Sequence, residues 1–409
     1  MKKKRDILFL CQFFYPEYIS SAQLPYDTVR ALAARGFRVD VLCGYPREYS
    51  DGSSIPGREQ VEGIGIHRLK YLQLDRSGFL GRLVNYFSFT AMVLLHLGTF
   101  ANYRCAVVYS NPPVLPWIAA WANRLFGTKL VFVAYDLYPE VATVTGTLNR
   151  GHPICRLMDH INRKVFQRAD QVVALSREME DFILKNRNVT REQLSVIPNW
   201  YSEPRNPESG ENPFRLAANG RFTVSYFGNM GTMQDLQTIL DAIRQLREEP
   251  FFFLFAGHGN KLERLKTIVR EEKMENVAVH AFLHGQDFQN ALAASDCALI
   301  SLEKGATGLC VPSKTYCYMS QGLPLAAIMD ESDIVRDIQQ GAGIWVRNGE
   351  GTLLAQRLRE LAADPEKTAR MGRVSRTLYQ ENYTKEISTQ KYSDLFCSLL
   401  GQPEKGALS

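Results

Sequence analysis

The sequence lacks the residue patterns of common metal and redox centres. Among its 409 residues, the eight cysteines form no CxxC pair, and the seven histidines include no HExxH motif. These absences exclude a zinc ribbon and a thioredoxin-like centre, and the cysteines are too few for a disulfide scaffold. We therefore expect reduced thiols, a cytosolic protein and no metal site.

The common nucleotide-binding motifs are also missing. No GxxxxGK[ST] occurs, and no GxGxxG is followed by an acidic residue at the right distance. Both P-loop ATPase chemistry and dinucleotide binding are therefore disfavoured.

No apolar run reaches the roughly 20 residues that a membrane-spanning helix needs. The basic start and the apolar residues 7–14 imitate a signal peptide, but no small-residue cleavage site follows, so we interpret this segment as the first buried strand. Residues 87–100 form a shorter apolar stretch, with Arg76 and Arg82 before it and Arg104 after it. Such a helix either lies in a membrane interface or is buried between the sheet and its neighbours.

The length and composition are those of a multidomain globular protein. At roughly 150 residues per domain, the chain is long enough for two or three domains. Hydrophobic residues make up 45% and charged residues 22%, while 48 basic against 43 acidic residues give a net charge of +5. This positive charge favours binding to an anionic surface of a partner, but it is too small for a typical nucleic-acid-binding protein.

Strand-like and helix-like segments alternate through both halves of the chain. This alternation predicts an α/β protein with doubly wound, mostly parallel sheets. Between the halves, residues 198–220 are rich in proline, asparagine and serine and show no apolar periodicity, which indicates a linker. We expect two Rossmann-like domains facing each other across a cleft (1–200 and 201–385), and a last helix (386–409) that crosses back to the first domain.

Ligands of such sheets bind in the loops after the strands. After the first strand, Ser20 and Ser21 open a helix, where small side chains would let a substrate approach the backbone, although an ordinary turn explains them equally well. Asp136 and Glu140 follow another strand and are candidates for a base or an acceptor of sugar hydroxyl groups. The alternative is that Asp136 caps the following helix.

Three glycine-containing turns in the second half point to a ligand that carries a diphosphate, because helix N-termini attract phosphate. The first turn contains Gly228 and Gly231, and the second contains Gly257, Gly259 and Lys261. The third, residues 304–314, leads into a helix that Ser313 would cap while Lys314 reaches an anionic group.

These pieces, in this order, resemble a known family. The matching segments are residues 14–17 (FYPE), 136–140 (DLYPE), 196–200 (VIPNW), 226–231 (YFGNMG), 256–259 (AGHG), 312–319 (PSKTYCYM) and 322–324 (GLP). They span almost the whole chain and are similar to those of the retaining family-4 glycosyltransferases of GT-B fold, in the branch that builds bacterial O-antigen, capsule and exopolysaccharide.

The resemblance implies a nucleoside-diphosphate sugar in the C-terminal domain, an acceptor in the N-terminal domain, and transfer with retention and without a metal or other cofactor. It places Asp136 where many relatives carry a histidine, and it pairs Lys314 with phosphate. The candidate catalytic residues are thus Asp136 and Lys314. The expected donor-binding residues are Gly228, Asn229, Gly231, Gly257, Gly259, Lys261, Thr307, Gly308, Pro312, Ser313 and Cys317, and the expected acceptor-side residues are Glu17, Ser20, Ser21 and Glu140.

The sequence also departs from the family pattern. Most relatives carry two glutamates eight residues apart, the second of which holds the nucleotide ribose, but the corresponding residues are Leu309 and Cys317. The basic residue that many relatives carry after Gly228 is absent as well, since residues 232–234 are Thr, Met and Gln. Lys261 or Lys314 would then compensate, or the donor would bind weakly.

We expect a cytoplasmic enzyme, peripheral at the inner face of the bacterial membrane, that acts on a polyprenyl-diphosphate-linked saccharide and contacts an anionic membrane surface. Two alternatives remain. A nucleotide-sugar epimerase of the same fold would need no acceptor, and a non-catalytic relative would only bind a sugar nucleotide.

Overall fold

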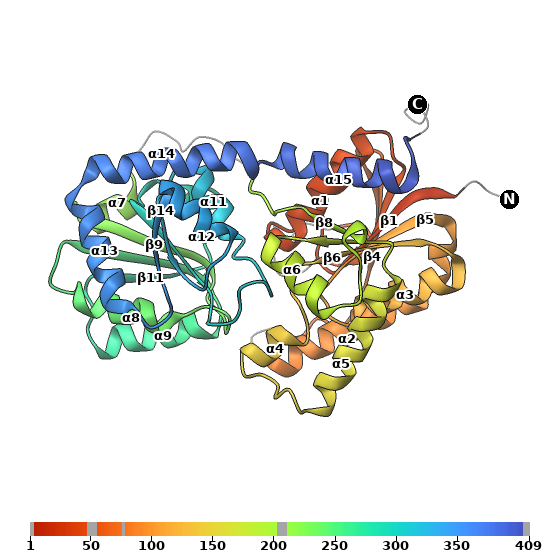
Figure 1. Cartoon of the computed structure of the whole chain (residues 1–409), viewed down its shortest axis with the longest axis horizontal. Coiled ribbons are helices and arrows are strands. Elements are labelled where there is room, and N and C mark those ends of the chain that lie inside the picture. The colour runs from red at the N-terminus through yellow and green to blue at the C-terminus, as the bar shows by residue number, and fades with distance from the viewer. Residues whose placement is uncertain (1–3, 47–54, 76–77, 203–210, 404–409) are drawn as a thin grey trace.

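The computed structural model describes residues 4–46, 55–75, 78–202 and 211–403. These residues form two α/β units, each built around one sheet, which lie side by side along the long axis of the molecule (Figure 1). The predicted fold class, two doubly wound sheets, is confirmed.

The sheet of the first unit has eight strands in the order β3-β4-β2-β1-β5-β6-β7-β8, and only β3 runs antiparallel to its neighbour. The strands are β1 (Arg5–Cys11), β2 (Val39–Gly44), β3 (Arg58–Val61), β4 (Ile64–Leu69), β5 (Tyr103–Tyr109), β6 (Lys129–Ala134), β7 (Gln171–Ala174) and β8 (Leu194–Val196). The segment that imitates a signal peptide is the buried central strand β1, as predicted.

Helices cover both faces of this sheet. They are α1 (Ser20–Ala34), α2 (Phe79–Leu95), α3 (Leu115–Phe126), α4 (Glu140–Val144), α5 (Pro153–Arg168) and α6 (Arg177–Asn186), with 3₁₀ turns at Leu97–Asn102 and Arg191–Gln193. Their ends follow local chemistry: Ser176 caps α6, and Gly127 ends α3 in the left-handed conformation that glycine tolerates. One face of the sheet packs on α2, α3, α5 and α6, and the other packs on α1.

The sheet of the second unit has six parallel strands in the order β11-β10-β9-β12-β13-β14. They are β9 (Phe222–Asn229), β10 (Phe251–His258), β11 (Val277–Ala281), β12 (Cys297–Ser301), β13 (Leu325–Ile328) and β14 (Gly343–Val346). The helices are α7 (Pro213–Ala218), α8 (Leu236–Gln245), α9 (Asn260–Glu271), α10 (Gly285–Ala293), α11 (Lys314–Ser320), α12 (Asp333–Asp337), α13 (Gly351–Ala363) and α14 (Pro365–Asn382), and a π turn spans Ile338–Ala342.

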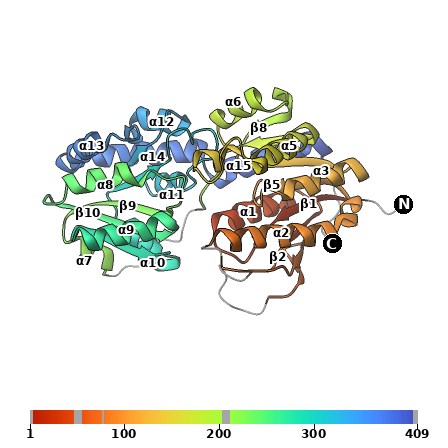
Figure 2. The ribbon, with the colours of Figure 1, turned by 90° about the horizontal axis from the view of Figure 1, so that it is seen from below.

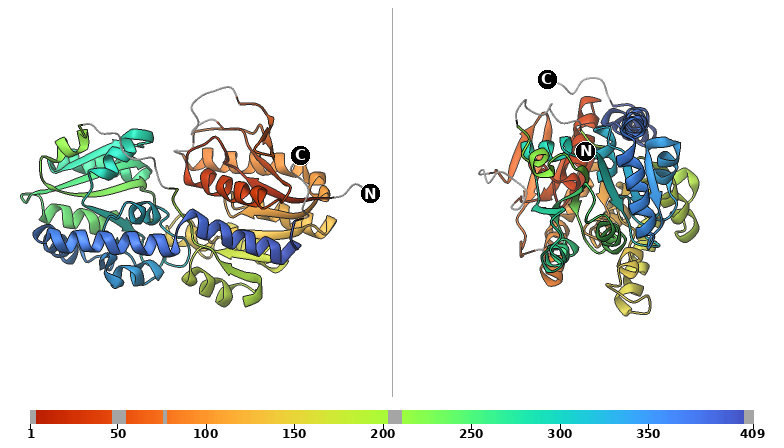
Figure 3. Two further views of the ribbon diagram at one scale, coloured as in Figure 1. Left: turned by 90° about the horizontal axis from the view of Figure 1, so that it is seen from above. Right: turned by 90° about the vertical axis from the view of Figure 1, so that its left-hand side faces the viewer.

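The last helix, α15 (Lys385–Leu400), follows α14 and lies on the first unit beside α1 (Figures 1 and 3). Phe396 is fully buried there, with its ring centroid 6.5 Å from those of Phe9 and Phe37. Lys385 adds an ion pair to Asp27 at 2.7 Å. The C-terminal helix therefore contributes to the core of the first unit.

The structure corrects the prediction that residues 198–220 form an irregular linker, because α7 lies within this range. The side chain of Asn212 accepts a hydrogen bond from the Phe214 amide at 3.0 Å, and Pro213 occupies the first turn, where proline is compatible with a helix. Residues 203–210 lie outside the described residues. The prolines that indicated a linker thus include one that starts a helix.

The apolar stretch 87–100 is not one helix, because α2 starts at Phe79, ends at Leu95, and is followed by the 3₁₀ turn. Phe89, Val93 and Phe100 are fully buried against the sheet, whereas Leu80 and Leu95 are 72% and 77% exposed. The buried alternative therefore holds for part of the segment, while Leu95 is exposed at the surface. Within the described ranges, no helix combines the length and apolarity needed to cross a bilayer.

Candidate functional site

The first two glycine turns interlock at the ends of neighbouring strands. β9 and β10 pair in register with Gly228 opposite Gly257 and Asn229 opposite His258, and the Met230 amide donates to the carbonyl of His258 at 2.8 Å. A Cβ atom at Gly257 would lie 1.8 Å from the carbonyl oxygen of Gly228, and one at Gly259 would lie 2.5 Å from that of Met230. Only glycine allows the two turns to approach this closely.

Lys314 lies against the first turn. Gly228 has φ +125°, and a Cβ there would meet the Cε of Lys314 at 3.0 Å, so the lysine stem packs on the glycine backbone. The ammonium group lies 5.0 Å from the centroid of the Phe288 ring. A cation is therefore held beside the glycine turns.

Asn229 shares this position. Its side-chain amide lies over the two other glycines, within 2.7 Å of a Cβ built at Gly259 and 3.2 Å of one built at Gly231. The structure thus brings five of the predicted donor residues together with the catalytic candidate Lys314; the five are Gly228, Asn229, Gly231, Gly257 and Gly259.

Lys261 is close to these turns, but protein groups already bind its ammonium group. It forms an ion pair with Glu303 and donates to the carbonyls of Thr232 and Gln234. The lysine consequently ties α9 to the loop after β12. Of the two lysines considered as substitutes for the missing basic residue, Lys314 is the better placed.

The third turn reaches toward the first unit. Ser313 occupies the position before α11 but makes no side-chain capping bond, contrary to prediction. Thr307, Gly308 and Pro312 line a cavity of about 450 Å³ between the units, together with Arg177, Glu178, Asp333 and other residues. Its lining includes residues at the ends of β7, β8 and β13, but none of Gly228, Lys314 and Asp136 lines it.

Cys317, expected at the ribose, is 1% exposed and packs in the core under α11. Its thiol is hydrogen-bonded to the side chain of Tyr201, and burial raises the pKa of Cys317 to about 11. The thiol is therefore neutral at physiological pH and contacts Tyr201 from the segment that joins the units.

Asp136 follows β6 at the carboxyl edge of the first sheet. Its amide and that of Tyr135 donate to the hydroxyl oxygen of Ser110, at 2.9 and 3.0 Å. The carboxyl group is half-buried, and burial raises the pKa of Asp136 to about 6. The alternative that Asp136 caps a helix is excluded, because α4 begins only at Glu140 with Pro139 before it. A carboxyl group that titrates near neutrality is suited to proton transfer.

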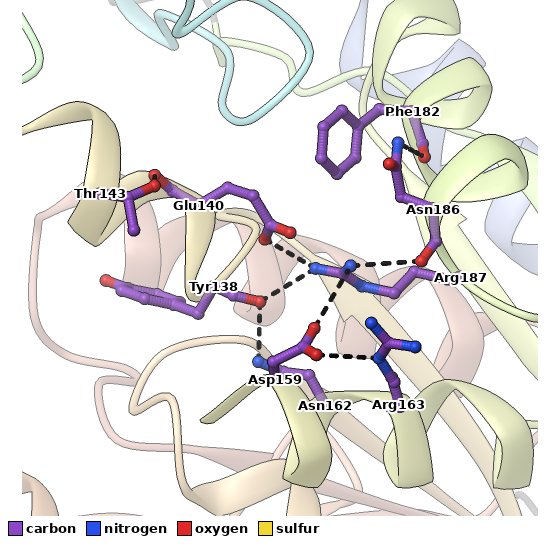
Figure 4. A network of polar contacts seen from close by, with 9 residues as sticks. All are labelled: Tyr138, Glu140, Thr143, Asp159, Asn162, Arg163, Phe182, Asn186 and Arg187. Atoms are coloured by element: carbon purple, nitrogen blue, oxygen red, sulfur yellow. Dashed lines mark hydrogen bonds and ion pairs between the residues drawn. The ribbon is translucent and has the colours of Figure 1, made fainter. Parts of the chain in front are cut away.

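Glu140 serves a different purpose from the one expected. Its carboxylate binds Arg187 at 2.6 Å, and the side chain of Arg187 is 2% exposed. Arg187 also donates to the Tyr138 carbonyl at 3.1 Å, and Asn162 donates to the same oxygen at 2.8 Å (Figure 4). Instead of facing an acceptor, Glu140 neutralises the arginine that fixes the loop following Asp136.

The remaining acceptor-side residues surround the loop between β1 and α1. Glu17 is buried, and Ser20 and Ser21 begin α1. Between them Tyr18 reaches the second unit, where its ring stacks on Phe282 with centroids 6.2 Å apart. The aromatic Tyr18 was not predicted, although a tyrosine in a loop at a cleft edge is a usable signal.

The two arginines proposed to face lipid that lie within the described residues differ in their contacts. Arg82 is exposed on α2, whereas Arg104 binds Asp6 at 3.4 Å and the carbonyl of Leu400, so it holds the C-terminal helix. Arg76 lies outside the described residues. Among the described residues, no group of three or more His, Cys, Asp or Glu is arranged to hold a metal ion.

Two family models match this chain, one on each unit. The "Glycosyl transferase 4-like domain" matches residues 23–200, and "Glycosyl transferases group 1" matches residues 221–364. Together they cover most of the chain, which therefore belongs to the glycosyltransferases that combine these two domains. The protein is a glycosyltransferase enzyme of the family that the motif order indicated.

Two of the similar proteins are glycosyltransferases of bacteria. The chain is 28% identical over 298 residues to the probable glycosyltransferase WbjE of Pseudomonas aeruginosa, covering 72% of this chain and 74% of that protein. It is 23% identical over 318 residues to the putative colanic acid biosynthesis glycosyl transferase WcaI of Escherichia coli K12, covering 74% and 77%.

Solved structures show the GT-B fold over nearly the whole chain. Sucrose-phosphate synthase from Thermosynechococcus elongatus superposes with a TM-score of 0.74 at 15% identity, covering 97% of this chain and 99% of that one. Anabaena HepE, solved with UDP-glucose, gives 0.68 at 17% identity, covering 96% and 99%. WaaG, a glycosyltransferase involved in lipopolysaccharide biosynthesis, gives 0.68 at 14% identity, covering 95% and 99%.

Proposed function

We propose that this enzyme transfers a sugar, with retention and without a metal, from a nucleoside-diphosphate sugar to a lipid-linked saccharide in bacterial surface polysaccharide biosynthesis. The binding of the donor is supported by one observation above all: the side chain of Lys314 packs on Gly228, which holds its positive charge beside the interlocked glycine turns. The pathway is supported by the names of two similar proteins, WcaI, which refers to colanic acid biosynthesis, and WaaG, which refers to lipopolysaccharide biosynthesis.

In this proposal the diphosphate leaving group gains negative charge as the sugar departs. Lys314 and the amide groups of the glycine turns are fixed before the reaction, so they stabilise that charge more in the transition state than in the ground state. Asp136, on the facing edge of the first sheet, is the titratable group on the acceptor side. Retention of activity in excess EDTA is expected and tests the metal-free part.

Binding of UDP, GDP and dTDP, measured by calorimetry, tests the donor site. Lys314→Met should weaken binding of the preferred diphosphate at least about tenfold, because one charge-assisted contact is lost. Lys304→Met is the matched control, since Lys304 is an exposed lysine on the same loop. Equal affinity of both variants and the wild type would remove Lys314 from the phosphate site. Release of an altered sugar nucleotide without acceptor would favour an epimerase, and no binding of any diphosphate would contradict both enzymatic readings of the site.

We further propose that the enzyme binds the membrane that carries the lipid-linked acceptor through a surface formed by α2, α3 and α5. α3 contacts both of the other helices, and the three cover one side of the first unit (Figure 2). Their exposed apolar side chains are Leu80, Phe87, Leu94, Leu95, Trp121, Leu125, Ile154 and Leu157. Exposed arginines lie among them on all three helices, at positions 82, 124 and 156. Apolar side chains flanked by cations suit an anionic membrane interface.

Flotation with liposomes tests this surface. Leu95→Ser should reduce binding to anionic vesicles, whereas Leu216→Ser, which changes a leucine 59% exposed on the other unit, should not. Reversing Arg124 and Arg156 to glutamate should abolish the preference for anionic over zwitterionic lipid. Flotation that is indifferent to all of these changes would contradict the proposed surface.

A further inference from the structure

The loop after β12 belongs to the second unit by sequence, but one of its residues is part of the core of the first. Leu309 is 3% exposed and packs in the same cluster as Leu137, Leu175 and Met179. The Leu137 amide donates to the carbonyl of Leu309 at 2.9 Å. This hydrogen bond is made by the residue that follows Asp136, so the donor-side loop docks directly beside the acceptor-side carboxyl group.

A second contact between the units lies at the facing starts of α6 and α12. The amide of Arg177, the first residue of α6, donates to the carboxylate of Asp333 at 2.9 Å. In return, the amide of Asp333, the first residue of α12, donates to the carboxylate of Glu178. Amide groups in the first turn of a helix have no partner within the helix. Each unit therefore supplies a carboxylate that satisfies an amide of the other.

Two details show that this contact is closely fitted. Arg336 forms an ion pair with Asp333 and lies 3.9 Å from the carboxylate of Glu178, which offsets the repulsion between the two acids. Gly308, with φ +80°, lies so near α6 that a Cβ there would be 3.1 Å from the carbonyl oxygen of Glu178. The residue before Leu309 thus also touches the first unit.

We propose that Leu309 together with the exchanged caps of Glu178 and Asp333 forms an interdomain clasp that holds the cleft assembled before a nucleotide binds. In this inference, which rests on the proposed reaction site beside Asp136, the three are positioning residues and contact no substrate. The clasp also accounts for Leu309 where the family pattern has a glutamate, because a carboxylate could not enter the apolar core of the first unit without a large desolvation cost.

The expected kinetic signature follows from population arithmetic. Without the clasp, only part of the protein is closed, and the apparent affinity for the donor falls by that fraction. Leu309→Ala and Glu178→Ala should therefore each raise the KM for the donor, by about tenfold if one molecule in ten stays closed, while saturating donor restores closure and kcat. If Leu309 and Glu178 had only a structural role, their replacement would lower stability without raising KM at unchanged kcat.

Small-angle scattering of the full chain provides a readout that does not depend on activity. The wild type should give the same radius of gyration with and without UDP, whereas both variants should expand without UDP and contract when it is added. Leu358→Ala is the control, since Leu358 is a fully buried leucine in the second unit away from the interface. It should lower stability and leave both KM and the radius of gyration unchanged.

The two proposals fail in distinguishable ways. If the proposed donor site is wrong, the wild type will give no calorimetric signal with any diphosphate. Expansion of the Leu309→Ala variant would in that case still support the clasp. If Leu309→Ala and Glu178→Ala scatter like the wild type, or if the wild type itself contracts on adding UDP, the clasp is refuted. Should Leu309→Ala fail to fold, the variant Glu178→Ala, which leaves the apolar core unchanged, decides alone.

Discussion

Replacing Asp136 by asparagine should stabilise the protein above neutral pH while it abolishes sugar transfer. Burial raises the pKa of Asp136 from an ordinary 3.8 to about 6. A carboxyl group with a raised pKa in the folded state favours folding at low pH, and that contribution is lost as the pH rises through about 6. Above that pH, the folded protein carries an ionised group that water would solvate better.

The size of the effect follows from the two pKa values. The interval between them corresponds to about 3 kcal/mol of unfolding free energy at high pH. Because the side chain is only half-buried, solvent screens part of this, and we expect a gain of about 1–3 kcal/mol for Asp136→Asn at pH 8. At pH 4 the folded state is almost fully protonated at this position, and the unfolded state, with its pKa of 3.8, is already protonated in part, so the gain should fall below about 1 kcal/mol.

Urea unfolding of the wild type and the variant at pH 4 and pH 8 measures this difference, and contributions of the other titratable groups cancel in the comparison. Asp181→Asn is the matched control, since Asp181 is exposed in the middle of α6 and its replacement should change stability equally at both pH values. Stabilisation of Asp136→Asn that is equal at both pH values, or destabilisation at pH 8, would refute the reasoning. A stabilised but inactive variant is the expected pattern for a strained functional group.

Three further changes test the framework around the site. Glu140→Gln should cost about 3 kcal/mol of unfolding free energy, since it leaves the buried charge of Arg187 without its closest counter-ion; an unchanged urea midpoint would contradict this. Gly257→Ala should lower the free energy of unfolding by about 3 kcal/mol or more and weaken diphosphate binding, because its Cβ would meet the Gly228 carbonyl oxygen at 1.8 Å. If the variant bound the diphosphate as tightly as the wild type in calorimetry, the two turns could separate without loss of the site. Phe396→Ala should cost about 3–5 kcal/mol, and retention of wild-type thermal stability would mean that α15 is dispensable to the first unit.

The sequence predicts helices and strands best where local residues mark their ends. Helix α3 and strand β6 are recognisable from the sequence alone, because a proline near the start, a left-handed glycine at the end and a continuous apolar run mark their limits. The hairpin of β3 and β4 was missed, since these edge strands alternate polar with apolar residues and contain charged side chains. The start of α2 was missed because Gly81 and Arg82 interrupt its apolar pattern.

The candidate site was predictable only in part, for a physical reason that the individual residues make clear. The glycine turns are recognisable from their own short sequences, and the first two lie side by side in the structure. The partners of Glu140 and Lys261 are 47 and 42 residues away, and nothing in the neighbouring sequence indicates that Arg187 and Glu303 will reach them. Ion pairs between distant segments depend on the packing of the whole sheet, so a charged residue beside a motif is easily taken for a ligand-binding residue.

The two departures from the family pattern can now be interpreted together. Leu309 and Cys317 are almost fully buried, one in the core of the first unit and the other in that of the second. A glutamate at either position would carry its charge into an apolar cluster, at a cost of several kcal/mol, unless the packing around it changed. The losses are therefore not independent gaps in an otherwise unchanged donor site. They lie in the loop before α11 and in α11 itself, a segment that packs against the first unit at Leu309 and against Tyr201 at Cys317. In this arrangement Leu309, which lies five residues before Lys314, accepts a hydrogen bond from the residue that follows Asp136, so one loop of the second unit connects the two candidate catalytic residues.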